Sequence, residues 1–594
     1  MTTRRALLLS AAFSGALLAA GTAFAAPPSG SAPTTAAADT IGETSNGQVI
    51  VTAEKRVASV QRVPIAVSAF TSKSRQVIGI DTLMDLTNFT PGLRYAPALD
   101  RIFLRGVGRQ TNNLATDPGV ATYVDGVYNA QTYTAGGDNL FIQRIEVLRG
   151  PQGTLYGRNG IGGAINAISA TPTDNFYAEG RASVGNYDAY SAEAVASGPI
   201  NDAVRFRLGA SYTYQGQGYF HNLATGGTSD GNGSSTYLEA QISANLGPHV
   251  EAWVKASTYW FDTTYGTTNT TVPYNAQTSL FNVFAPNFPN AAFAYSGLIP
   301  FTQLNPSITG NPGIANKWDF SNNTPSKITQ TGNYLLVGHL TWHAPGVDVK
   351  YIGGAAHYRL DLWGDADGTD VTSITIPLNP GSTCASGFVG PCAALTYNPT
   401  AISHYVEDKS FYSHELNLVS AYEGPFQWLA GLYYYHEQYT QPVTVALPFY
   451  PGITNPVFPT TSFPFFGGAA APNPGRYVTA SDQDMHADSY AGFAQIDWKF
   501  APTLKLTAGL RYTYDDKAGD ESYRDICGGC SGLGAYFEQP NLGTSTPVLD
   551  VTNLVISMAP AQGAGIATLN SATGDYVRHL SANWSALTGT LGLE

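Results

Sequence analysis

Few residues in this sequence have the type and spacing that catalysis would need. Ten histidines are scattered along 594 residues, and no His-Glu-x-x-His pattern is present to hold a catalytic zinc. Asp117 and Asp125 would offer two nearby carboxylates, but aspartate is common in turns, and we interpret both as turn residues. No Walker-type Gly-Lys-Ser/Thr and no Gly-x-Gly-x-x-Gly that opens a helix is present. We therefore predict that the protein is not an enzyme and has no cofactor and no metal site.

The composition indicates a large, weakly charged chain that is rich in aromatic residues. Charged residues make up 12% and aromatic residues 12% of the chain, whereas globular proteins usually have about 25% charged residues. The formal net charge is −13. Because a nucleic-acid partner requires a basic surface, we expect no binding to nucleic acid.

The N-terminal residues indicate export. Arg4 and Arg5 precede an apolar stretch at 6–20, and Ala23-Phe24-Ala25 forms a small-x-small cleavage site, which together are typical of a secretory signal peptide at 1–25. No later apolar run reaches the length of a membrane helix, so a membrane-spanning form has to be a closed β-barrel. In an exported chain the four cysteines predict two short loop disulfides, Cys384–Cys392 and Cys527–Cys530, rather than a zinc or redox site.

Three segments of different composition follow the signal peptide. Residues 26–47 are small and polar and predict a flexible tether. Residues 48–56 contain a short β-branched run that ends in charged residues, which predicts a strand without a sheet. Residues 57–172 predict a compact α+β domain, with a helix near 80–86 and strands at 65–70, 101–104, 121–124 and 144–148.

From about residue 173 to 594 the sequence predicts long alternating strands. Val204, Phe206 and Leu208 share one face of such a strand, while Arg205 and Arg207 share the other, as in a lipid-facing barrel strand. Short turns alternate with long excursions, which is also typical of outer-membrane barrels. We predict about twelve strands, which begin near residues 176, 187, 203, 235, 250, 332, 347, 403, 425, 485, 503 and 576. Since a barrel that encloses a plug has about 22 strands, we expect the C-terminal part of the barrel to be missing from this chain.

Three motifs in the α+β segment resemble a known family. They are Arg105-Gly106-Val107-Gly108, the run Tyr123-Val124-Asp125-Gly126-Val127-Tyr128, and the run from Ile142 to Asn166 that contains Arg149-Gly150-Pro151-Gln152-Gly153 and Gly157. Together they resemble the plug domain of TonB-dependent outer-membrane receptors. The resemblance implies a transmembrane β-barrel with an N-terminal plug in its lumen, in the outer membrane of a Gram-negative bacterium. The glycines supply backbone freedom where turns pass close to other backbone.

The run Val49-Ile50-Val51-Thr52-Ala53 matches the TonB box of the family and lies between the tether and the plug. An unpaired β-branched segment can add to the edge of a partner sheet through main-chain hydrogen bonds. The resemblance thus implies the inner-membrane TonB complex as a partner. An ordinary first strand of the plug is the alternative interpretation.

The resemblance also implies that Arg105 and Arg149 pair with acidic residues on the barrel wall. Alternation along 412–418 places Glu415 on the inward face, which makes it our candidate partner. A hydrated lumen carboxylate is the alternative.

The resemblance implies energised uptake of a scarce solute by a monomer embedded in outer-membrane lipid. A ferric siderophore is the expected class of small-molecule ligand, while cobalamin and oligosaccharides stay open. The alternatives are a passive porin and a secreted soluble carbohydrate-active β protein. Specificity would lie in the loops 263–333, 368–402, 441–484 and 517–575, where aromatic residues either stack on a ligand or pack the loops: Phe281, Phe284, Phe288, Tyr450, Phe465 and Phe466.

Overall fold

The computed structural model describes residues 50–594 apart from 53–54, 57, 60, 62–64, 97–100, 110, 112, 130–139, 265–306, 310–315, 317, 325, 369, 371, 378–393, 460–465, 528–547 and 554–566. The signal peptide, the tether, Val49 and Ala53 lie outside the described residues. So do Cys384, Cys392 and Cys530 and the side chain of Cys527, and the two disulfides stay predictions.

A five-stranded sheet forms the core of the N-terminal domain. Its strand order is β3 (Ala66–Thr71), β9 (Ile142–Arg149), β10 (Gly163–Ser169), β7 (Val120–Val124) and β8 (Val127–Tyr128). Only β10 and β7 pair in parallel. Ile145, Val147 and Ile165 in the central strands are fully buried, so this sheet is the apolar centre of the domain. The strands predicted at 65–70, 121–124 and 144–148 correspond to β3, β7 and β9.

Two helices follow β3 where the sequence predicted one near 80–86, and the first contacts β3 and β9 while the second contacts β4 (Leu93–Ala96). They are α1 (Ser72–Ile78) and α2 (Leu83–Phe89). Gly79, with φ +73°, ends the first helix, and Thr82 caps the second in a capping box with Asp85. Such a cap stabilises a helix by about 1 kcal/mol, and it fixes the start of α2 three residues later than predicted. Ile80 lies between the helices, where it is fully buried.

Two tight hairpins use the motif residues of the domain. Arg105 and Gly106 join β5 (Arg101–Leu104) to β6 (Val107–Gly108), and Asp125 and Gly126 join β7 to β8. All four turn residues have φ between +52° and +82°, which is the type I′ pattern that matches strand twist. β5 also pairs with β4 (Leu93–Ala96).

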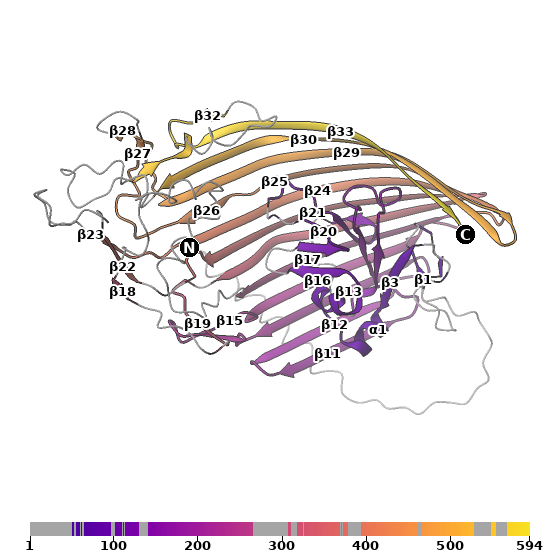
Figure 1. The fold of residues 1–594 in the computed structure, drawn as a ribbon. Helices are drawn as coiled ribbons and strands as arrows, with labels where there is room; N and C mark the ends of the chain where they lie inside the picture. The colour runs from indigo at the N-terminus through magenta and orange to yellow at the C-terminus, as the bar shows by residue number, and fades with distance from the viewer. Residues whose placement is uncertain are drawn as a thin grey trace, which may run out of the picture.

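Twelve long antiparallel strands form a curved wall with the N-terminal domain on its concave side (Figure 1). Their first residues agree with the predicted starts to within six residues, except for β29, which begins eight residues early. The strands are β11 (Tyr177–Gly185), β12 (Ala189–Pro199), β13 (Val204–Gln215), β16 (Gly233–Asn245), β17 (Val250–Thr264), β20 (Lys327–Ala344), β21 (Val347–Asp365), β24 (Ile402–Ser420), β25 (Phe426–Thr440), β29 (Tyr477–Ala501), β30 (Leu504–Cys527) and β33 (Tyr576–Leu593).

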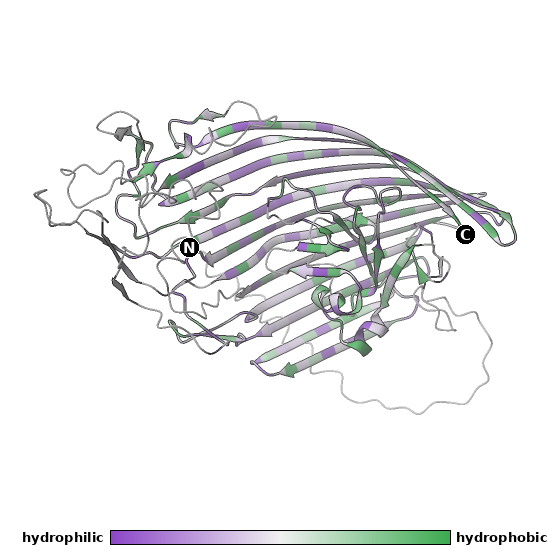
Figure 2. Cartoon of the chain, in the orientation of Figure 1, coloured by the Kyte–Doolittle hydropathy of each residue, from purple (hydrophilic) through white to green (hydrophobic). Residues whose placement is uncertain are grey.

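The wall has one apolar and one polar face. On β13, Leu208 is 53% exposed on the outer face, whereas its neighbour Arg207 is 3% exposed on the lumen face. Residues of opposite hydropathy alternate along the other wall strands as well (Figure 2). This pattern confirms the predicted transmembrane β-architecture with a plug, since lipid contacts one face and the domain inside contacts the other. Among the described residues, neither helix has the length and apolar character to cross a bilayer.

At one end of the wall every connection between the long strands is short, namely 200–203, 246–249, 345–346, 421–425 and 502–503. At the opposite end the connections are long, apart from the three-residue turn 186–188 between β11 and β12. At the other end the strands extend further than predicted: β20 begins at Lys327, β29 begins at Tyr477, and β30 continues to Cys527. Polar residues in these extensions hid the strands from sequence analysis, because outside the membrane both faces contact water while the backbone pairing continues.

Shorter strands accompany the long connections. β14 (Phe220–Asn222) pairs with β15 (Thr228–Ser229) and β19 (Asp319–Phe320), and β22 (Ser373–Pro377) pairs with β18 (Ser307–Thr309) and β23 (Ala394–Tyr397). The wall sheet also includes β26 (Val443–Ala446), β27 (Val457–Pro459), β28 (Phe466–Ala469), β31 (Leu549–Asp550) and β32 (Thr568–Leu569).

A charge on the outer face should prevent insertion into the membrane. We predict that Leu208→Arg lowers the amount of the protein in the outer membrane, because arginine on a lipid-facing strand costs about 2–4 kcal/mol at the bilayer midplane. Leu208→Ala is the matched control, since it shortens the side chain without adding charge. Membrane fractionation measures both variants, and normal insertion of Leu208→Arg would contradict a lipid-facing surface.

Candidate coupling segment and contacts between plug and wall

The segment that resembles a TonB box is docked in the structure. Ile50 and Val51 form β1, which pairs antiparallel with β2 (Ala58–Ser59). Val51 is fully buried and belongs to the apolar core of the plug. The sequence predicted an unpaired, exposed strand, and this was wrong: β2 supplies a partner only a few residues further along the chain, and the plug core covers the valine.

A buried carboxylate holds the next residue. The backbone N–H of Thr52 donates to Glu146 Oε1 at 2.8 Å, and the Thr52 hydroxyl donates to the same carboxylate. Arg144 Nε donates to Glu146 Oε1 at 2.8 Å, and Arg144 Nη2 donates to Thr52 Oγ1 at 3.3 Å. Because Arg144 and Glu146 are almost fully buried, each depends on the other to keep its charge in the interior. Both residues lie on β9, so the segment is tied to the central sheet of the plug.

Lys55 ties the same segment to the wall. Its Nζ lies 2.6 Å from Glu415 on β24 and 4.7 Å from the centre of the Phe493 ring. Burial lowers the pKa of Lys55, and the Glu415 carboxylate opposes this shift. Asn417 donates a second hydrogen bond to Glu415. Glu415 therefore contacts the N-terminal domain, but through Lys55.

Neither arginine predicted to pair with Glu415 does so. Arg105 occupies an exposed hairpin turn, and Arg149 is half-buried at the end of β9. In the described part of the chain, neither makes an ion pair with the wall. The predicted pairing was wrong because Arg105 lies in an exposed turn and Arg149 lies at a strand end. Lys55, which follows β1, pairs with Glu415 instead.

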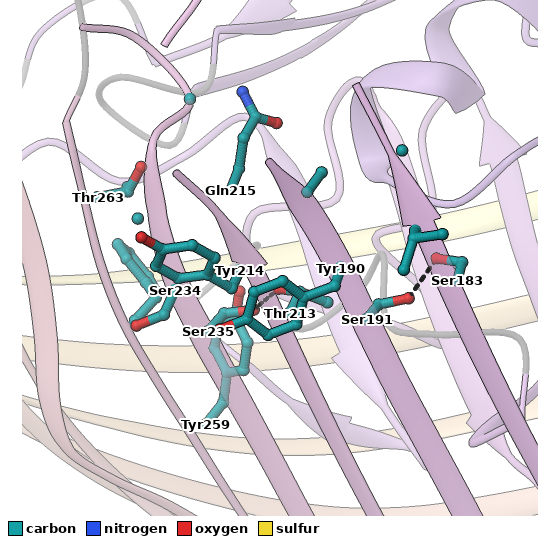
Figure 3. Close-up of a pocket in the computed structure, with 16 residues that line it drawn as sticks. Ser183, Tyr190, Ser191, Thr213, Tyr214, Gln215, Ser234, Ser235, Tyr259 and Thr263 are labelled. Carbon is teal, nitrogen blue, oxygen red and sulfur yellow. Dashed lines mark hydrogen bonds between the residues drawn. The ribbon is translucent and has the colours of Figure 1, made fainter. Parts of the chain in front are cut away.

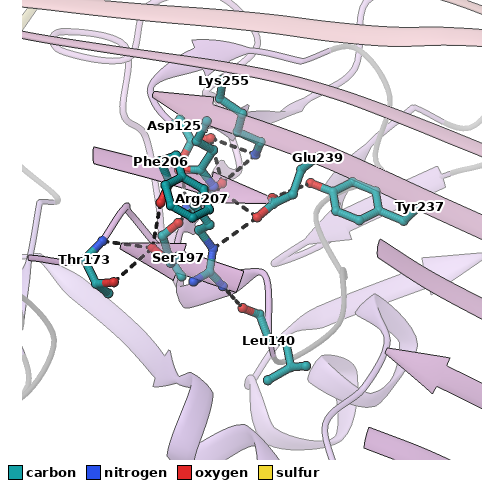
Figure 4. Close-up of polar contacts among 12 residues, drawn as sticks. Asp125, Leu140, Thr173, Ser197, Phe206, Arg207, Tyr237, Glu239 and Lys255 are labelled. Atoms are coloured by element: carbon teal, nitrogen blue, oxygen red, sulfur yellow. Dashed lines mark hydrogen bonds and ion pairs between the residues drawn. The ribbon is translucent and has the colours of Figure 1, made fainter. Parts of the chain in front are cut away.

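A different plug motif residue binds the wall. Lys255 Nζ on β17 lies 3.0 Å from Asp125 Oδ2 and also donates to the hydroxyl of Ser169 (Figure 4). The Ser169 backbone N–H and hydroxyl donate to the same carboxylate at 2.7 and 2.8 Å. A ring nitrogen of His339 lies 2.8 Å from the carbonyl oxygen of Asp125. Asp125 thus closes the β7–β8 hairpin and fixes it to the wall.

A second contact lies on the neighbouring strands. Arg207 donates to Glu239 at 3.2 Å and to the carbonyl oxygen of Leu140, and Tyr237 donates to Glu239 at 2.9 Å (Figure 4). The ring of Phe141 fits against Gly209, where an added Cβ would lie 2.5 Å from the ring. A larger residue at 209 would therefore require the Phe141 ring or its surroundings to shift.

A third cluster involves Arg158, which lies within the glycine-rich motif. Its guanidinium lies 3.2 Å from Asp117 and 3.9 Å from Glu437 on β25. Burial disfavours the charged form of Arg158, but the two carboxylates outweigh it and raise its pKa. Lys409 on β24 lies 2.6 Å from Glu437, and Lys517 on β30 lies 3.7 Å from Asp117. Asp117 is therefore an ion-pair partner as well as a loop residue.

The remaining plug motif residues lie in turns near the wall. Gly150 and Gly157 have φ of +105° and +80°. A Cβ on Gly157 would lie 2.5 Å from the guanidinium of Arg511, so this glycine permits close approach to β30. Pro151 and Gly153 lie between them, and Gly153 faces Thr588 on β33.

Sequence reasoning missed the wall residues that bind the plug. Arg207 and Lys255 are charged residues at inward positions of their strands, and this placement was the available signal. It also passed over two short patterns. His339 and His343 form a His-x-x-x-His pattern, but they lie on a strand and are not brought close together as they would be on a helix. Gly227-Thr228-Ser229-Asp230-Gly231 matches Gly-x-Ser-x-Gly, but it contains β15 and not the strand-to-helix turn that this motif requires. Among the described residues, no three His, Cys, Asp or Glu form a metal cluster.

One of the predicted loop aromatics can be placed. Tyr450 is 3% exposed, and its ring centre lies 4.8 Å from that of Tyr397 in an apolar cluster of the loops. It packs the loops instead of lining an open ligand site. Phe281, Phe284, Phe288 and Phe465 and the side chain of Phe466 lie outside the described residues.

Comparison with protein families gives two matches. Residues 59–164 match the TonB-dependent receptor plug domain, and residues 287–545 match the TonB-dependent receptor-like β-barrel. Among curated proteins, the pesticin receptor of Yersinia pestis is 33% identical over 181 residues, which cover 30% of this chain and 26% of the receptor. The ferripyoverdine receptor of Pseudomonas aeruginosa is 30% identical over 172 residues, which cover 28% of this chain and 20% of that protein.

Solved structures show the same fold. The ferric yersiniabactin uptake receptor FyuA of Yersinia pestis superposes with a TM-score of 0.55 at 15% identity, covering 89% of this chain and 62% of FyuA. The ferripyoverdine receptor of Pseudomonas aeruginosa gives a TM-score of 0.52 at 14% identity, covering 82% of this chain and 60% of the receptor. The chain therefore spans about three fifths of the length of these receptors.

Members of this family are transport receptors that interact with TonB and with their ligands. The plug match, the barrel match and the observed plug-and-wall architecture agree with each other. The chain belongs to the TonB-dependent receptor family and is a protein of the Gram-negative outer membrane.

Proposed function

We propose that the protein takes up a scarce solute across the outer membrane with energy supplied by TonB, and that it is a transporter and not an enzyme. The supporting observation is the connection of residues 50–55 to both parts of the molecule. Thr52 binds Glu146 in the central plug strand, and Lys55 binds Glu415 in the wall. Force applied at this segment would act directly on the strand around which the plug is built.

The relatives favour a ferric siderophore as the solute. Two that resemble this chain are named for pyoverdine and one for yersiniabactin, whereas another, from Vibrio vulnificus, is named as a vitamin B12 transporter. The buried ion pairs between plug and wall argue against a passive porin, because an open pore would leave these charges to water. We place the tether at 26–47, the TonB box at 48–56, the plug at 57–172 and the barrel from 173, and we propose a monomer.

Docking of β1 has a consequence for this mechanism. β2 occupies one edge of β1 and Val51 is buried in the plug core, so TonB binding by strand addition at this edge requires the segment to leave the plug. The polar contacts of Thr52 and Lys55 would hold the segment until a ligand or thermal opening releases it. The proposed role of Val49 to Ala53 in TonB binding thus involves main-chain groups of Ile50, Val51 and Thr52 that the resting structure already uses.

The coupling role is tested by removing a main-chain donor. We predict that Ile50→Pro abolishes cross-linking of this segment to the periplasmic domain of TonB, because proline has no N–H to donate to a partner strand. Ile50→Ala keeps the N–H and should cross-link like the wild type. Cysteine cross-linking at Thr52 in whole cells measures both variants, and equal cross-linking by Ile50→Pro would refute the assignment of the TonB box.

The ion pair between Lys55 and Glu415 is tested by replacing Lys55 alone and then replacing both residues. We predict that Lys55→Met leaves Glu415 buried without its cation, at a cost of about 3–5 kcal/mol, and therefore releases the segment. Hydrogen exchange of the amides at 50–59 should become faster by at least tenfold. The double variant Lys55→Met with Glu415→Met should recover most of the protection, because no unpaired charge is left.

The exposed Lys73 provides the matched control, since Lys73→Met removes a charge of the same kind from the plug surface. Its exchange at 50–59 should equal that of the wild type. Unchanged exchange in Lys55→Met would show that the ion pair does not hold the segment.

A further inference from the structure

A cavity of about 470 Å³ lies against the wall near the outer ends of β11, β12, β13, β16 and β17 (Figure 3). This volume falls in the range of small-ligand sites. Thr213 is four residues beyond Gly209, where the plug touches β13, so the cavity lies about 13 Å further toward the long loops. Among the described residues, the plug contacts on β13 and β16 lie on the side of this cavity nearer to the short connections.

Four hydroxyl side chains form a row across the cavity. Ser183, Ser191, Thr213 and Ser235 are direct neighbours in register on four successive strands. All four occupy the lumen side of the alternation, as Arg207 does. The hydroxyls bond in two pairs, Ser183 with Ser191 at 2.7 Å and Thr213 with Ser235 at 2.6 Å. Since each hydroxyl has one donor and two acceptor positions, each pair keeps one donor and three acceptors for a ligand.

Aromatic side chains continue the row. Phe261 is the register partner of Ser235, and Tyr259 lies one position inward on the same face of β17. The two ring centres are 5.6 Å apart with the planes tilted by 48°. The cavity thus combines a line of hydroxyls with an adjacent apolar surface.

None of the sixteen residues that line the cavity is charged. The next row toward the plug contains Arg181 and Glu193, and further charged side chains follow along the strands closer to the plug. A ligand that carries a net charge would find no counter-ion in the cavity itself and would lose hydration there. A neutral ligand with many hydroxyls would exchange its hydrogen bonds with water for equivalent ones.

We propose that this cavity is a subsite for a neutral polyhydroxylated group, namely a sugar ring. The hydroxyl row would donate to and accept from the ring hydroxyls, while Tyr259 would pack against the apolar face of the ring. Phe261 is 8% exposed and supports Tyr259 from the core. The subsite rests on the proposed function only in taking the long-loop end as the side of ligand entry. Binding there requires neither the coupling segment nor TonB.

The test uses the full chain in detergent micelles and maltotriose, cellotriose and raffinose as probes. Saturation-transfer NMR should show binding of at least one of these neutral saccharides, and trigalacturonate, which is anionic, should bind at least tenfold more weakly. The double variant Ser191→Ala with Thr213→Val should lower the affinity by about tenfold, since each change removes one hydrogen-bonding group. Thr213→Ser keeps the hydroxyl and should bind within twofold of the wild type.

Thr236→Val is the matched control, because it makes the same change on β16 at the position next to Ser235 but on the outer face. It should bind like the wild type. The coupling variant Ile50→Pro should also bind normally, which separates a failure of this subsite from a failure of the transport proposal. Absence of binding for all three saccharides, or equal binding by the double variant, would overturn the inference.

Discussion

The rest of this structure depends on one constraint: a charge that points into the lumen must be matched there. Alternation along each wall strand turns one face to lipid and the other to the lumen, so the inward residues that the plug covers lose access to bulk water. Arg207, Lys255 and Glu415 are each less than 8% exposed, and each has a partner of opposite charge. The position of the plug therefore determines whether these buried charges have their partners.

This constraint includes the coupling segment. Lys55 neutralises Glu415, and Thr52 supplies two of the donors that Glu146 accepts. Withdrawal of the segment would leave a wall carboxylate without its cation and would remove two donors from a plug carboxylate. Both changes raise the free energy of the buried site, so these contacts oppose release of the segment. Once the segment has left, the unpaired groups would destabilise the plug. The same contacts thus serve as a restraint at rest and as a point of force transmission.

Local features of the fold were predictable from the sequence, and long-range partners were not. Alternation identifies β13, and Asp125 was predicted to be a turn residue and does lie in a tight turn with Gly126, because both features depend on neighbours in the chain. Lys55 and Glu415 are 360 residues apart, and Lys255 and Asp125 are 130 apart. Many pairings of an arginine with a carboxylate would satisfy the rule that lumen charges are matched. Only the register of the wall strands determines which pair forms.

The lumen face of β12, β13 and β16 changes its chemistry along the strands. At the level of the plug it carries Arg207 and Gln241, which donate to the carbonyl oxygens of Leu140 and Ala170 of the plug, and Glu239, which accepts from both of these side chains. Two rows beyond the Gly209 contact it carries only hydroxyls. Charged groups are stable where the plug supplies fixed partners, whereas a surface that stays open to changing occupants is better lined by groups that both donate and accept. The division along the strands therefore separates the part of the wall that holds the plug from the part that is free to meet a ligand.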